Sequence, residues 1–138
     1  MNSSAAGVAW DLGDLYAGLD DPKIDQDLQT ALQRAEAFET AYRGKINVPG
    51  GPSADLLAAA MHELEGLSEQ RDKPQVYAGL QHAAKSDDPQ RGALLSRTQQ
   101  KGVAVDQHLI FFDLEWVHLP DGAVKPLLDA PALARWRH

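Results

Sequence analysis

The stretch that decides the fold class is residues 21–44, which read DPKIDQDLQTALQRAEAFETAYRG. Asp21 before Pro22 is typical of a helix start, because aspartate caps the first turn and proline is tolerated at the first helical position. Gly44 is typical of a helix end. Between them, apolar residues recur at steps of three and four, which is the period of one helix face: Ile24, Leu28, Ala31, Leu32, Ala35, Phe38 and Tyr42. We therefore predict an amphipathic helix over about residues 22–43.

The same start and stop signals continue along the chain. The loop Asn47-Val48-Pro49-Gly50-Gly51-Pro52 cannot propagate a helix. Ser53 then caps a predicted second helix with inward-facing Leu56, Leu57, Ala60, Leu64 and Leu67. Lys73-Pro74 starts a third, with Val76, Tyr77, Leu80 and Ala84. Asp88-Pro89 opens a long fourth helix, to about His118, with the stripe Leu95, Thr98, Gly102, Val105, Leu109, Phe112 and Trp116.

Shorter helical segments follow Pro120. Asp121 is expected to cap a small helix carrying Val124, Leu127 and Leu128, and Asp129-Ala130-Pro131 to begin another. No segment shows sustained alternation of apolar and polar residues. The sequence thus predicts an all-α fold: a helical bundle or hairpin stack of four main helices plus short C-terminal helices. We expect the first and fourth helices to carry the core, with Leu28, Phe38, Leu109 and Phe112 buried, and a close helix crossing at Gly102.

Length and composition narrow the class of protein. With 138 residues, we expect an N-terminal arm over 1–19 and a single helical domain over 20–138. The chain has no cysteine, which excludes thiol catalysis and thiolate metal sites. A net charge of -7 without a basic patch argues against nucleic acid as a partner. No apolar stretch reaches the roughly 18 residues of a membrane helix, and Met1 to Gly7 lacks the pattern of a secretory signal.

The strongest candidate for chemistry is His62-Glu63. In His-Glu-x-x-His two imidazoles one turn apart bind zinc, but here Gly66 replaces the second histidine. Glu63 and Glu65 point to different sides of a helix, so they cannot flank one bond. His108 with Asp113 also diverges, and His82 with Asp87 and Asp88 lies at a helix start. We therefore predict no catalytic and no metal-binding residue in this chain.

The aromatic residues of the fourth helix leave two interpretations open. Tyr77, Phe111, Phe112 and Trp116 are most simply core residues, and the alternative is a peptide-binding surface built from some of them. Ile110 and Phe111 lie off the main stripe, so either another helix covers them or they form an exposed docking surface. We expect the second arrangement, an interdomain surface through which the isolated chain self-associates weakly.

One string near the N-terminus is distinctive. Trp10-Asp11-Leu12-Gly13-Asp14-Leu15-Tyr16 resembles the Trp-Asp-Leu-x-Asp-Leu-Tyr opening of oligoendopeptidase F-type enzymes, in the thimet-oligopeptidase-like clan of zinc peptidases. Weaker similarity continues to His138 and includes Asp20-Asp21-Pro22, Phe38-Glu39, Tyr42-Arg43-Gly44-Lys45, Asp87-Asp88-Pro89 and Phe111-Phe112. From the residues alone, the string over 10–16 is a short capped turn that packs on the first helix.

The resemblance implies a function for the region. Such peptidases are cytoplasmic and much longer than this chain, and their His-Glu-x-x-His zinc site lies downstream of the matched region. It implies a non-catalytic N-terminal domain, truncated from its catalytic partner, that helps enclose the channel in which short peptides are hydrolysed. Zinc then belongs to the full-length enzyme only. The alternative is a freestanding helical adaptor for partner proteins; a small enzyme with an unrecognised site is a third reading.

Overall fold

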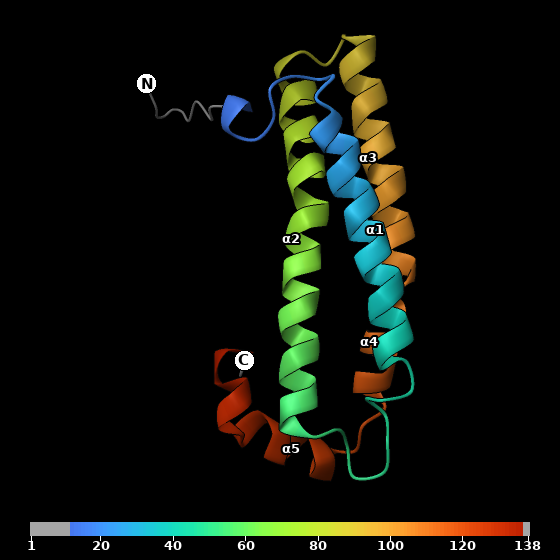
Figure 1. The fold of residues 1–138 in the computed structure, drawn as a ribbon, viewed down its shortest axis with the longest axis vertical. Coiled ribbons are helices and arrows are strands. Elements are labelled where there is room, and N and C mark those ends of the chain that lie inside the picture. Colours follow the sequence, from blue (N-terminus) through green and yellow to red (C-terminus); the bar gives the residue numbers. More distant parts are fainter. Residues whose placement is uncertain (1–11, 137–138) are drawn as a thin grey trace.

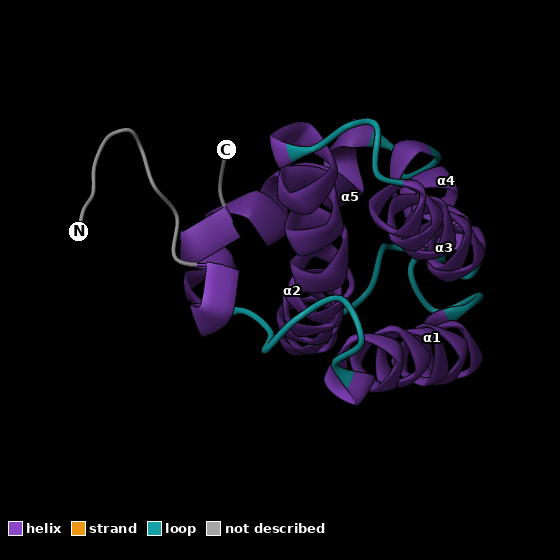
Figure 2. Cartoon of the chain, turned by 90° about the horizontal axis from the view of Figure 1, so that it is seen from above, coloured by secondary structure: helices purple, strands orange, loops and turns teal. Residues whose placement is uncertain are grey.

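The computed structural model describes residues 12–136, and its core is a bundle of three antiparallel helices. They are α1 (Pro22–Tyr42), α2 (Ala54–Ala84) and α3 (Pro89–Gln107), and seen from above they occupy the corners of a triangle (Figures 1 and 2). The all-α prediction is confirmed: the described residues contain helices and no strand. Helix α2, the longest, packs extensively on both α1 and α3, so the expectation that the first and last long helices carry the core missed its central element.

Short helices occupy both ends of the chain. The helix α4 (Ile110–Val117) continues below α3, and α5 (Asp121–Asp129) and the 3-10 helix η2 (Pro131–Trp136) then fold back beside the start of α2 (Figure 1). At the opposite end of the bundle, the 3-10 helix η1 (Leu12–Asp14) precedes α1. Among the helices of residues 12–136, none is both long enough and apolar enough to cross a membrane.

The three long helices begin where the sequence predicts, whereas Asp121, predicted to cap the short helix after Pro120, is the first residue of α5, and its cap Pro120 makes no side-chain hydrogen bond. The side chains of Asp21, Ser53 and Asp88 accept hydrogen bonds from the backbone N–H groups of Lys23, Leu56 and Gln90, at 3.0, 3.1 and 2.9 Å. These bonds satisfy donors that have no partner inside the helix. After α1, Gly44 adopts a positive φ of 79°, the conformation that favours glycine at a helix end.

The predicted helix start at Lys73-Pro74 is wrong, because α2 runs through it without a break. Proline inside a helix costs about 3 kcal/mol, since it removes a hydrogen bond and crowds the preceding turn. Here Pro74 is itself fully buried, and Leu67 and Tyr77 on either side of it are buried as well. Burial of these residues of α2 against α1 and α3 outweighs the local cost, so the predicted second and third helices are one.

The predicted helix over 89–118 is divided instead at His108 and Leu109. The N–H groups of these two residues bond three residues back, to the carbonyls of Val105 and Asp106, at 3.1 and 2.9 Å. Such bonds wind the backbone more tightly than an α-helix. The extra rotation turns Phe111 and Phe112 together toward the core, where they are 3% and 6% exposed. This one turn therefore changes which face of α4 is buried.

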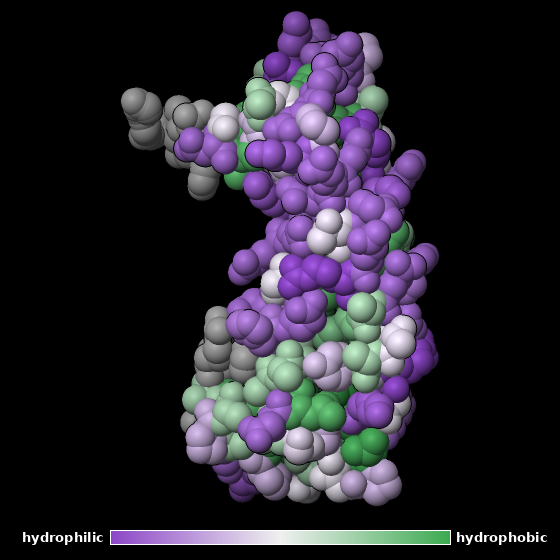
Figure 3. All heavy atoms as spheres, in the orientation of Figure 1, coloured by the Kyte–Doolittle hydropathy of each residue, from purple (hydrophilic) through white to green (hydrophobic). Residues whose placement is uncertain are grey.

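The buried apolar residues form two clusters. The arm cluster, at the η1 end, consists of Tyr16, Ile24, Leu28, Tyr77, Ala78 and Leu94. The larger base cluster, at the α4–α5 end, includes Phe38, Ile46, Leu57, Leu67, Val105, Phe111, Phe112, Leu119, Leu127 and Leu133. Leu28, Phe38 and Phe112 are buried as predicted, whereas Leu109 is half-buried and Leu94 replaces Leu95 in the core. In the view of Figure 3, apolar side chains gather at the base end, and the middle of the molecule is polar.

Candidate functional site

The His62-Glu63 pair lies on α2, and Glu63 is engaged by α1. Arg34 donates from Nε and Nη2 to the two carboxylate oxygens of Glu63, at 3.0 and 3.1 Å, and His62 is exposed. The guanidinium lowers the pKa of Glu63, so this carboxylate is held ionised by a structural partner. Within residues 12–136 no three acidic or histidine side chains converge in a way that could hold a metal ion.

Gly66 has a structural role that the zinc-motif comparison did not suggest. A Cβ atom at this position would lie 2.7 Å from Nη2 of Arg34. The absence of a side chain therefore provides the space in which Arg34 crosses α2 and reaches both Glu63 and Gln70. Gly102 similarly accommodates Gln75 and Arg71 of α2, since its Cβ would lie 3.2 Å from the Gln75 side-chain oxygen. Side chains of α2 thus pack against α3 at Gly102, and the close crossing expected there stays a prediction.

The family-motif residues divide between described and undescribed parts of the chain. Trp10 and Asp11 lie outside the described residues, and Leu12, Gly13 and Asp14 form η1. Tyr16 is 2% exposed; its ring packs edge-on against Tyr77 with centroids 5.1 Å apart, and its hydroxyl donates to Asp27 at 2.6 Å. Burial, and then this hydrogen bond, raises the pKa of Tyr16 far above its usual range. In its described part, the motif is a turn that packs on α1 and α2.

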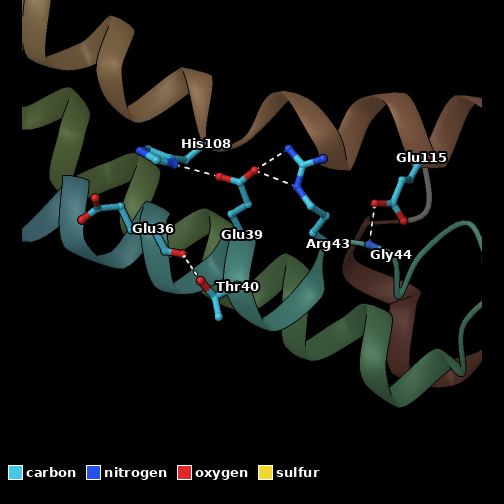
Figure 4. A network of polar contacts seen from close by, with 7 residues as sticks. All are labelled: Glu36, Glu39, Thr40, Arg43, Gly44, His108 and Glu115. Atoms are coloured by element: carbon cyan, nitrogen blue, oxygen red, sulfur yellow. Dashed lines mark hydrogen bonds and ion pairs between the residues drawn. The ribbon is translucent and has the colours of Figure 1, made fainter.

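A polar network fixes α4 against the end of α1 (Figure 4). Nδ1 of His108 lies 2.8 Å from Oε1 of Glu39, and Nε of Arg43 donates to Oε2 of the same carboxylate at 2.8 Å. The hydrogen bond with His108, and then that with Arg43, holds the pKa of Glu39 below its usual value. Glu39 thus links the turn between α3 and α4 to the last turn of α1.

Glu115 makes the second link. Its carboxylate accepts hydrogen bonds from the backbone N–H groups of Gly44, Ile46 and Asn47, at 2.7, 3.1 and 3.0 Å. Burial alone would raise the pKa of Glu115, but the three hydrogen bonds together outweigh it, and the pKa lies below the usual value. The loop that leaves α1 is therefore closed around a side chain 68 or more residues further along the chain.

We call Glu115 and its three backbone N–H donors the Glu115 clamp. Beside it lies an apolar groove that we regard as the candidate functional site. It has a volume of about 440 Å³ and lies between α2, α4, α5 and η2. On α2 its residues follow the i, i+4, i+7 spacing of one helix face: Leu57, Met61 and Leu64. The remaining wall consists of Phe112, Asp113, Trp116, Val124, Leu128 and Leu133, of which Asp113 alone is charged. Such a groove suits an apolar side chain or helix face rather than an ion.

The surface predicted at Ile110 and Phe111 needs a correction. Phe111 is 3% exposed and lies against Phe38, with ring centroids 5.7 Å apart, because the tight turn before α4 rotates it inward. It cannot contribute to a docking surface, whereas Ile110 is 52% exposed. The two interpretations of the aromatic residues separate in the same way: Tyr77 and Phe111 are core, and Phe112 and Trp116 also line the groove.

Sequence reasoning did not find the groove or the long-range contacts of Glu39, Glu63 and Glu115. Glu39 and His108 are 69 residues apart, and Arg34 and Glu63 are 29 apart. No periodicity signals such pairs, because they depend on how the helices are rotated against one another. Comparisons of the chain with protein-family models, with curated proteins and with solved structures give no match.

Proposed function

We propose that this chain is a non-catalytic helical docking domain, and that it belongs to an oligoendopeptidase F-type zinc peptidase. In that role it helps to enclose the substrate channel of a cytoplasmic enzyme that hydrolyses short peptides, and the zinc ion is held by the catalytic part. The resemblance over residues 10–16 supports the family. The apolar groove supports the docking role.

The observation that carries the docking role is the composition of the groove. Eight of its nine lining residues are apolar, and Trp116 and Met61 remain half-buried rather than covered. Leu128 is 37% exposed at its edge. A groove lined mainly by apolar side chains, with a single charged residue among them, has the usual lining of a binding site. The α4 wall of the groove is held to the α1 end of the bundle, because Glu39 bonds the turn before α4 and Glu115 bonds the loop after α1.

The reading frame downstream of His138 is the first test. A His-Glu-x-x-His helix encoded there supports the peptidase, and a stop codon at that point excludes it. The groove would then serve a freestanding adaptor, which is the alternative function.

Binding is the second test, and it uses the downstream part of the polypeptide as a separate protein. We expect it to bind this chain in calorimetry, and we expect Leu128→Glu in the groove to weaken binding by at least about tenfold. Val76→Glu is the matched control, because Val76 is 52% exposed on α2 and does not line the groove. Equal affinities for both variants would exclude the groove as the docking site.

The isolated chain is expected to hydrolyse no peptide, with or without added zinc, because Gly66 stands where a second zinc ligand is required and Glu63 is bound to Arg34. A fluorogenic short peptide and a zinc titration measure this. Turnover that survives repurification and disappears in His62→Ala would overturn the assignment.

A further inference from the structure

The apolar groove at the base has one charged side chain in its lining, that of Asp113 on the α4 wall. Phe112, Asp113 and Trp116 share one side of α4, because Trp116 follows Phe112 by four residues and Asp113 by three. They differ in depth: Phe112 is 6% exposed, Trp116 is half-buried and Asp113 is exposed. The carboxylate therefore lies at the exposed rim of the groove, next to more deeply placed apolar side chains.

Asp113 differs from the carboxylates described above. Glu39, Glu63 and Glu115 each accept hydrogen bonds from groups of the same chain. Within residues 12–136, in contrast, no Lys, Arg or His side chain forms an ion pair with Asp113. Its exposed carboxylate is thus accessible to a cationic group of a bound partner.

The position of this charge restricts the chemistry of the partner. A single polar or charged group in an otherwise apolar site usually fixes the orientation of the ligand and its specificity. An acidic peptide or an anionic amphiphile would place a like charge beside Asp113, which opposes binding. The net charge of -7 of the chain acts in the same direction at longer range. The partner that fits is apolar inside the groove and positively charged at the α4 rim.

The walls of the groove favour a helical partner over an extended one. They are the helices α2, α4 and α5 and the 3-10 helix η2, whose backbone groups bond mainly within each helix. None of these walls is a strand edge with which an extended peptide could pair, so its own N–H and C=O groups would lie unpaired against apolar side chains. A helix satisfies these groups internally and needs only an apolar face.

We propose that the groove binds an amphipathic helix, whose apolar face packs between α2, α4 and α5 and whose flank carries a Lys or Arg that pairs with Asp113. The proposal rests on the docking role proposed above for the groove, and it adds the chemistry of the partner. It does not depend on the peptidase assignment.

Two labelled synthetic peptides of about five helical turns test the proposal. Both carry leucine along one face; the first has Lys on both flanks of that face, and its twin has Glu at the same positions. We expect fluorescence anisotropy to show that the Lys peptide binds about fivefold or more tightly than the Glu peptide, because an opposite-charge contact replaces a like-charge contact. The preference should shrink at high salt.

Charge variants locate the preference at the groove. Asp113→Asn should remove most of it, and Asp113→Lys should reverse it in favour of the Glu peptide. Asp87→Asn is the matched control, because Asp87 is exposed between α2 and α3 and does not line the groove. Equal effects of Asp113→Asn and Asp87→Asn would overturn the proposal, since the net charge alone would then explain the preference.

Neutral substitutions test the groove separately from the charge. Leu128→Gln should weaken binding of both peptides by at least about threefold. Val76→Gln, at a residue of α2 that is 52% exposed and outside the groove, should leave both unchanged. Circular dichroism confirms that each variant remains helical.

The outcomes distinguish this proposal from the docking role itself. Binding that Leu128→Gln weakens but that shows no charge preference would overturn the cationic partner and leave the docking role in place. No binding of either peptide up to about 1 mM would overturn the helical partner, and the downstream polypeptide then tests the docking role independently. A dimer of the wild-type chain in sedimentation that Leu128→Gln abolishes would also overturn the proposal, because the occupant would then be a second copy.

Discussion

The two ends of the bundle bury apolar residues in different ways. The arm cluster is small, and the turn containing Tyr16 closes it from outside, with the Lys73 ammonium 4.8 Å from the centroid of the Tyr16 ring. The base cluster is larger and is left open along the apolar groove, where Trp116 and Leu128 remain accessible. The arm cluster is covered by residues of the same chain, whereas apolar side chains of the base cluster remain accessible along the groove. This difference is the reason for proposing the docking role at the base.

The largest expected effect concerns the centre of the base cluster. Phe38 is 1% exposed, and the rings of Tyr42, Phe111 and Phe112 lie 4.9, 5.7 and 5.7 Å from it between centroids. We expect Phe38→Ala to reduce the free energy of unfolding by about 3–5 kcal/mol, because it leaves a cavity among aromatic rings. Urea denaturation measures the loss. A change below about 0.5 kcal/mol would mean that the open end is not packed as a core.

Lowering the pH should reduce the stability of the base cluster more than that of the arm cluster. The pKa of Glu115 is lower in the folded chain than the value of about 4.3 usual for an unfolded glutamate. Its contribution is therefore complete above that value and is lost as the pH falls through the folded pKa. We expect Glu115→Gln to cost about 1–2 kcal/mol at pH 7, and this cost to shrink as the pH falls through the folded pKa, because only the ionised carboxylate makes charged hydrogen bonds that the amide cannot replace.

Unfolding titrations at several pH values give this dependence. Glu36→Gln is the matched control, because the Glu36 carboxylate points away from the network in Figure 4. A pH-independent cost of Glu115→Gln would contradict the clamp.

The stability of the arm cluster should depend measurably on a single hydroxyl group, that of Tyr16. Tyr16→Phe keeps the ring against Tyr77 but removes the hydrogen bond to Asp27. We expect a loss of about 0.5–1.5 kcal/mol in the free energy of unfolding, the usual worth of one such bond. Thermal denaturation compares it with Tyr42→Phe in the base. If Tyr16→Phe is neutral, the arm is held by ring packing alone.

The smallest effect is expected midway between the clusters. Gly66→Ala should gain helix stability of up to about 1 kcal/mol but displace Arg34, so the two terms nearly cancel. In an Arg34→Ala background the gain should appear in full. A double-mutant cycle of unfolding free energies measures it. Additive substitutions would show that Arg34 does not use the space at Gly66.

Local signals predicted the fold class and most helix starts, because caps and apolar periodicity act within a few residues. They failed where packing between helices decided the outcome: Pro74 is carried inside α2, and the turn at His108 rotates Phe111 into the core. The groove depends on α2, α4 and α5 meeting, and Met61 and Trp116 carry no mark of that meeting in the sequence. Ile110 was recognised as unusual because a second apolar stripe on the predicted long fourth helix is visible in sequence alone.

The paired use of glycine and arginine has a mechanical consequence. Arg34 of α1 crosses α2 at Gly66, and Arg71 of α2 lies against Gly102 of α3. A slide of α1 along α2 by one turn would set a side chain, that of His62 or Gln70, in the place that only glycine leaves open. The position of each helix along its neighbour is therefore favoured by a side chain that occupies the space at a glycine. The register of α1 on α2 is thus set in part by a residue without a side chain, and not by apolar packing alone.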